Sequence, residues 1–139
     1  MAVNPDSATQ PRIAVLDAKA VRWILEGCNW LTATEVAERA GVHQTQLQQW
    51  LSDGTIFAVE WDGEARFASY LFGPDRHPVA GIATVLQILE GSSARSVAAW
   101  FESASSYLGG RRPRQLIATS PELVADAARD TVEAEQFAG

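Results

Sequence analysis

The chain has 139 residues, of which 47% are hydrophobic and 20% charged, enough apolar material for one domain of ordinary size or two very small ones. Its net charge of -6 argues against broad, sequence-independent binding to nucleic acid, which needs cations to neutralise phosphates. Cys28 is the single cysteine, which excludes an internal disulfide and a cysteine-clustered zinc site. The sequence has neither a run of apolar residues long enough to span a membrane nor a signal-peptide pattern in residues 1–10, so we expect a cytoplasmic protein without membrane contact.

The N-terminal region divides into an irregular stretch and a first helix. Residues 1–16 contain two prolines and small polar side chains, which predicts a mobile lead-in. A helix is expected over residues 17–27, with Asp17 as its cap and a glycine at its end. Trp23 and Trp30 flank the end of this helix, and we expect both to be core aromatics.

Residues 32–52 carry the spacing of a helix-turn-helix. Thr32 and Glu35 have the positions of a capping box, and Gly41 supplies a tight turn after the first helix. The second helix is predicted to put Leu47 and Trp50 into the core. A small residue, a glycine and an aliphatic residue at these intervals are typical of a helix-turn-helix, although helix pairs without a DNA function share the pattern.

A β-hairpin is predicted directly after the second helix. Residues 56–61 and 64–72 are rich in β-forming side chains and flank an Asp-Gly pair, the strongest short hairpin signal. A hairpin in this place is a wing, so residues 17–72 resemble a small winged module of the MerR or excisionase kind. Residues 73–78, with two prolines and a glycine, are expected to link it to a C-terminal domain over residues 79–139. The predicted fold class is mainly α: a winged helix-turn-helix with a small β-hairpin, followed by a compact helical C-terminal domain.

The outward face of the second helix is the candidate DNA-reading surface. Glutamine can bond adenine through two hydrogen bonds in the major groove, and the phosphates would be held by nearby arginines. The candidate DNA-binding residues are Thr45, Gln48, Gln49, Ser52, Arg39 and Arg66. The alternative is a module that binds protein or dimerises, because the face itself carries no cation.

The C-terminal half is predicted to be helical throughout. Residues 79–90 form a helix with only a narrow polar strip, which indicates that protein nearly surrounds it. Ser93 is expected to cap the next helix, and the turn at residues 108–113 leads into a helix begun by a proline. A last helix begins after Ser120.

Three motifs in this half resemble the C-terminal domain of the MbcA/ParS/Xre antitoxin family. They are Ala99-Trp100-Phe101, the Leu108-Gly109-Gly110-Arg111-Arg112-Pro113 turn, and Ser120-Pro121-Glu122-Leu123-Val124. The resemblance covers about residues 79–135. It implies a cytoplasmic, homodimeric antitoxin that blocks the NAD pocket of a RES-domain toxin and represses its own operon through DNA binding. Many members carry an all-helical N-terminal domain, whereas residues 55–72 here predict a wing.

The resemblance places the toxin-binding surface in the C-terminal half. A pocket built for an anionic dinucleotide presents cations, so an inserted segment should offer carboxylates. The candidate toxin-binding residues are Trp100, Arg111, Arg112, Asp130, Glu133, Glu135 and Phe137. Two alternatives stay open. The arginines bond helix-end carbonyls and Asp126 or Glu122 within the fold, and residues 130–139 are a frayed helix end that contacts nothing.

The leading functional hypothesis is therefore an antitoxin with a RES-domain toxin, a second copy of itself and operator DNA as partners. The alternative is a stand-alone dimeric helix-turn-helix transcription regulator. No enzyme is expected, because the sequence pairs no nucleophile with a base and carries neither a metal-ligand cluster nor a phosphate-binding loop. We expect no cofactor, and we assign no role to the histidines.

Overall fold

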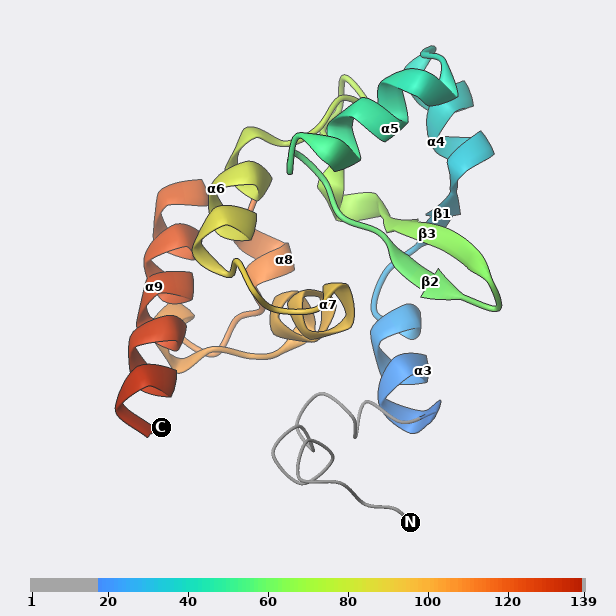
Figure 1. Ribbon diagram of the computed structural model, residues 1–139. Coiled ribbons are helices and arrows are strands. Elements are labelled where there is room, and N and C mark those ends of the chain that lie inside the picture. Colours follow the sequence, from blue (N-terminus) through green and yellow to red (C-terminus); the bar gives the residue numbers. More distant parts are fainter. Residues whose placement is uncertain (1–17, 139) are drawn as a thin grey trace.

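The computed structural model describes the backbone of residues 18–138 and, within that range, the side chains of all but residues 18, 20, 21 and 136–138. The expected lead-in and the Asp17 cap lie outside the described residues. The elements run in chain order as follows (Figure 1): α3 Ala18–Glu26, β1 Trp30–Thr32, α4 Ala33–Ala40, α5 Gln44–Ser52, β2 Val59–Trp61, β3 Glu64–Ala68, η1 Ser69–Leu71, α6 Ala80–Ile88, α7 Ala94–Glu102, η2 Ser106–Leu108, α8 Pro113–Leu116 and α9 Pro121–Ala138.

The helix-turn-helix is formed by α4 and α5, and its local signals are confirmed. Oγ1 of Thr32 accepts a hydrogen bond from the Glu35 amide at 3.1 Å, and the Thr32 amide donates to Oε1 of Glu35 at 2.9 Å. Gly41 ends α4 in the left-handed conformation, with φ of 68°. A side chain at this position would be strained, which is why glycine makes the turn.

The sheet has three antiparallel strands in the order β1-β3-β2. Asp62 and Gly63 both have positive φ, 54° and 76°, and join β2 to β3 as the two central residues of a tight hairpin turn. The predicted wing is therefore confirmed, although its strands are shorter than the predicted runs. Strand β1 was not predicted; it precedes α4 and pairs with β3, Leu31 opposite Phe67.

Helix α6 packs against α9, and its large apolar side chains are buried or half-buried, while Thr84 and Gln87 of its predicted polar strip are exposed. Ile82 and Val85 of α6 are completely buried, and α9 runs alongside this helix (Figure 1). A Cβ atom on Gly81 would come within 2.7 Å of Cβ of Pro121, so a glycine is required for this close approach. Ser93 caps α7, and Pro113 begins α8, both as predicted.

A single apolar cluster joins the winged half to the helical half. It includes residues from Ile24 in α3 to Ala128 in α9, and its largest fully buried side chains are Phe67 and Phe101. The prediction that Trp23 is a core aromatic is wrong, because the residue is 43% exposed on the outer side of α3. Trp30 is half-buried, and its Nε1 donates to the Ile24 carbonyl at 3.1 Å.

The predicted position of Trp50 in the core is confirmed only in part. The residue is half-buried and packs against the rings of Phe72 and His77, with centroid distances of 6.3 and 5.7 Å. It therefore ties α5 to the predicted linker, residues 73–78, while Leu47 fills the core itself with no exposed surface.

Candidate nucleic-acid interface

The outer face of α5 presents small polar and amide side chains to solvent. Thr45, Gln48, Gln49 and Ser52 are all exposed, as the helical phase predicted. Nε2 of Gln49 donates to Oδ1 of Asp53 at 2.8 Å, so this amide is partly engaged in the helix end. Gln48 has no such contact within the described part of the chain, which leaves its amide free to bond a ligand.

The exposed cations next to α4 come from α4 itself and from the loop after the sheet. Arg39 is exposed at the end of α4, as expected for a phosphate contact. Arg76, which the sequence analysis missed, lies beside it and donates from Nη1 to the Arg39 carbonyl at 3.2 Å. The sequence predicts only a linker for the loop that carries Arg76, because no local signal in it shows that it folds back onto α4.

Arg66, which was predicted to hold a phosphate, is already paired with a carboxylate of the protein. Its guanidinium donates to Oε1 of Glu64 at 3.1 Å, so the charge is paired on the same strand. Glu60, Asp62 and Glu64 are exposed around the hairpin turn, which makes the tip of the wing acidic. Such a tip repels a DNA phosphate, so phosphates would be attracted to Arg39 and Arg76 instead.

One carboxylate of the helix-turn-helix stays ionised over an extended pH range. The pKa of Glu35 is lowered, first by the hydrogen bond from the Thr32 amide and further by its proximity to Arg39 and Arg66. This carboxylate serves the cap of α4, and its negative charge partly offsets the two arginines nearby.

The candidate toxin-binding residues are divided between two places. Trp100, Asp130 and Glu135 line one groove of about 440 Å³ between the ends of α7 and α9, together with serines of the segment that follows α7. Nε1 of Trp100 donates to Oγ1 of Thr131 at 3.0 Å, which holds the indole against α9. Glu133 is exposed but does not line the groove, and the side chain of Phe137 lies outside the described residues.

Arg111 and Arg112 have different surroundings. Arg111 is exposed, and its carbonyl accepts a hydrogen bond from the Ser105 amide at 2.9 Å, which closes the turn. Nη1 of Arg112 lies 3.1 Å from Oε1 of Glu102. An internal carboxylate partner was one of the two alternatives, but the partner is Glu102 and not Asp126 or Glu122.

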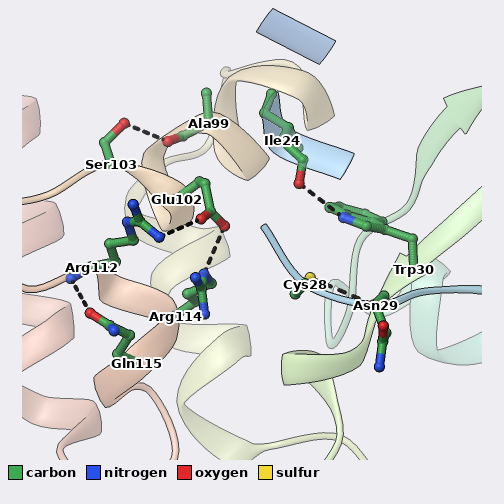
Figure 2. A network of polar contacts seen from close by, with 10 residues as sticks. All are labelled: Ile24, Cys28, Asn29, Trp30, Ala99, Glu102, Ser103, Arg112, Arg114 and Gln115. Atoms are coloured by element: carbon green, nitrogen blue, oxygen red, sulfur yellow. Dashed lines mark hydrogen bonds and ion pairs between the residues drawn. The ribbon is translucent and has the colours of Figure 1, made fainter. Parts of the chain in front are cut away.

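Glu102 is the centre of a polar cluster between the two halves of the chain, shown in Figure 2. Only 3% of Glu102 is exposed, and its second carboxylate oxygen, Oε2, lies 2.7 Å from Nε of Arg114. Burial raises the pKa of the nearby Cys28 thiol and raises that of Tyr70 well above its ordinary value. The Tyr70 hydroxyl has no hydrogen-bond partner among the described residues.

The part of the chain that the structure describes contains neither a cluster of metal ligands nor a membrane-spanning helix. Its histidines, cysteine and carboxylates form no group of three that could hold a metal ion. In the same part, none of the helices combines the length and apolar character needed to cross a membrane.

Comparison with known proteins finds a solved structure of similar fold. No protein-family model and no curated protein matches the chain. The chain is similar to the solution structure of a protein designated Rv2175c, with a TM-score of 0.66 and 21% sequence identity over 75% of this chain and 81% of that one. At this level of identity the likeness shows the fold, and it agrees with the predicted class: mainly helical, with a small antiparallel sheet.

Proposed function

We propose that this protein is a DNA-binding regulator that reads its operator with α5. The observation that carries the proposal is the exposed Gln48 amide on a helix whose other side is fixed by the completely buried Leu47. A short rigid helix with free amide and hydroxyl groups fits the major groove, where an amide side chain distinguishes adenine.

The affinity of such an interface would depend on few phosphate contacts. Arg39 and Arg76 are the exposed cations beside the helix-turn-helix, whereas the wing is acidic and Arg66 is paired. We therefore expect a shallow dependence of affinity on salt, with a slope equivalent to about two neutralised phosphates per protomer. The direct test is binding of the full chain to fragments of its own promoter, measured at several salt concentrations.

A second candidate function is neutralisation of a RES-domain toxin. The groove formed by Trp100, Asp130 and Glu135 supports it, because carboxylates beside an indole suit a cationic side chain of a protein partner. This candidate rests also on the resemblance of residues 79–135 to the MbcA/ParS/Xre antitoxins. It includes what that resemblance implies, a homodimer that represses its own operon.

The antitoxin candidate is tested with the RES-domain protein encoded beside this chain, if its gene neighbourhood contains one. The double variant Asp130→Asn/Glu135→Gln should weaken inhibition of NAD consumption by at least about tenfold. The control is Glu122→Gln/Asp126→Asn, which removes the same charge from α9 outside the groove. Equal inhibition by both double variants would contradict a role for the groove, and absence of any complex would remove the antitoxin candidate.

A further inference from the structure

A pocket of about 430 Å³ lies beside the helix-turn-helix, away from the outer face of α5. Its apolar lining comes from Leu31 of β1, Val36 of α4 and Phe72 after η1, and its polar lining from Arg39, Ser69 and Arg76. This volume lies within the range of small-molecule sites, and an apolar wall with a few convergent polar groups is typical of them.

Neither arginine of the pocket forms an ion pair with a carboxylate of the described residues, although Glu35 lies close enough to offset part of the Arg39 charge. The ion pairs of the described residues involve other arginines, and Arg76 donates only to a neutral acceptor, the Arg39 carbonyl. Guanidinium groups bind carboxylate and phosphate oxygens through two parallel hydrogen bonds. The pocket therefore offers two cationic groups beside an apolar wall.

The backbone at Arg76 is held in an unusual conformation. Its φ is 66°, in the left-handed region that residues other than glycine rarely adopt. The Arg76 amide donates to the Gly73 carbonyl at 2.8 Å, and the Gly73 amide donates to the His77 carbonyl at 2.9 Å. These bonds fix the loop so that Arg76 faces the end of α4, a strained arrangement of the sort that accumulates at ligand sites.

We propose that this pocket binds an organic anion that combines one carboxylate or phosphate group with a hydrocarbon body. The anionic group would bond Arg39 and Arg76, and the hydrocarbon would lie on Leu31, Val36 and Phe72. A DNA phosphate would bond the same guanidinium groups but has no hydrocarbon that could pack against the apolar wall. The lining therefore favours a small amphipathic molecule.

Binding at this place would act on both helices of the helix-turn-helix. The loop over residues 73–78 contacts α4 through Arg76 and packs on Trp50 of α5 through His77. A ligand that neutralises the two arginines also removes cations that DNA would use. We therefore expect the ligand to lower DNA affinity; this consequence rests on the proposed function, whereas ligand binding itself does not.

The test is a titration of the isotope-labelled full chain with octanoate, followed through backbone amide shifts in nuclear magnetic resonance spectra. Saturable shifts should gather at Leu31, Val36 and Gly73, with a Kd below about 1 mM. Acetate, which lacks the hydrocarbon, should bind at least about tenfold more weakly. Octyl phosphate, compared with octanoate, shows which anionic group the arginines prefer.

Arg39→Met and Arg76→Met should each weaken octanoate binding by about tenfold or more, because each removes one charged hydrogen-bonding group. Arg22→Met, a change of an exposed arginine on α3, makes the same charge change outside the pocket and should leave the affinity unaltered. Dispersed amide spectra establish that each variant is folded.

The proposal is overturned if neither octanoate nor octyl phosphate gives saturable shifts at the pocket, or if both arginine variants bind as the parent does. It is also overturned if a DNA duplex, and neither small anion, shifts the pocket amides; the arginines would then belong to the DNA interface. If the protein binds octanoate but no DNA, the proposed function fails while the ligand site stands.

Discussion

Nε of Arg114 lies 2.7 Å from Oε2 of Glu102, a residue of which only 3% is exposed. The same carboxylate also bonds Arg112, and it occupies the space next to Gly27, where a Cβ atom would collide with it. Glu102 thus connects the end of α3 to α8 across the boundary between the two halves of the chain (Figure 2).

Loss of this carboxylate should destabilise the whole fold. Glu102→Ala leaves Arg112 and Arg114 without their partner, and removal of one member of a buried ion pair typically costs about 3–5 kcal/mol. Since the two arginines are 40% and 21% exposed, we expect a loss near the lower end, about 3 kcal/mol, in chemical denaturation. A loss below about 1 kcal/mol would mean that the cluster contributes little.

Gly27 should tolerate a side chain only when Glu102 is shortened. Gly27→Ala alone is expected to cost about 1–3 kcal/mol, because the new methyl group meets the buried carboxylate. In the Glu102→Ala background the same change should be close to neutral. A double-mutant cycle measures this coupling, and additive losses would contradict the contact.

Tyr70 should weaken the fold at neutral pH and more so in alkali. Its hydroxyl is buried and has no hydrogen-bond partner among the described residues, so Tyr70→Phe should raise the free energy of unfolding by about 1 kcal/mol. Because burial raises the folded-state pKa of Tyr70, its neutral form is retained in the fold while the unfolded chain ionises near the ordinary value of about 10. Stability should therefore be unaffected by this group below about pH 10 and fall progressively above it.

Denaturation curves of the parent and of Tyr70→Phe at rising pH check this expectation. The alkaline loss assigned to Tyr70 should be absent from the variant. Tyr107→Phe is the matched control, since it removes the same hydroxyl group from a residue that is 46% exposed. An identical alkaline decline in the parent and in Tyr70→Phe would contradict the role of this hydroxyl.

Trp50 should contribute to stability, but less than a fully buried tryptophan. The residue is half-buried between Phe72 and His77, so Trp50→Ala is expected to cost about 2–3 kcal/mol, below the usual value for a core aromatic. Trp23→Ala, at a site 43% exposed, should change stability by no more than about 0.5 kcal/mol. If thermal unfolding shows the same loss of stability for both variants, the partial burial of Trp50 does not stabilise the fold.

The features that the sequence predicted depend on neighbours close in the chain. The cap formed by Thr32 and Glu35, the turn at Gly41 and the hairpin turn at Asp62 and Gly63 each involve a few consecutive residues with specific backbone needs. The exposed face of α5 followed from its helical period, once Leu47 was placed inside.

The features that the sequence did not predict depend on contacts between distant segments. Strand β1 has three residues and no visible alternation, and it exists because it pairs with β3, more than thirty residues later. The partner of Arg112 is fixed by the packing of α7 against α8, and the position of Arg76 by a loop that folds back onto α4. The prediction for Trp23 is wrong because a tryptophan near a helix end can lie either in the core or at the surface, and the local sequence does not distinguish the two.

The central claim is that α5 reads DNA, and fluorescence anisotropy with labelled fragments of the protein's own promoter tests it most directly. The parent should bind one fragment specifically, and Gln48→Ala should lose about 1–3 kcal/mol of that binding while its denaturation curve stays unchanged. Gln87→Ala, an exposed glutamine on α6, is the control and should bind as the parent does. Binding that Gln48→Ala leaves intact, or the absence of binding to every fragment at low salt, would contradict the claim.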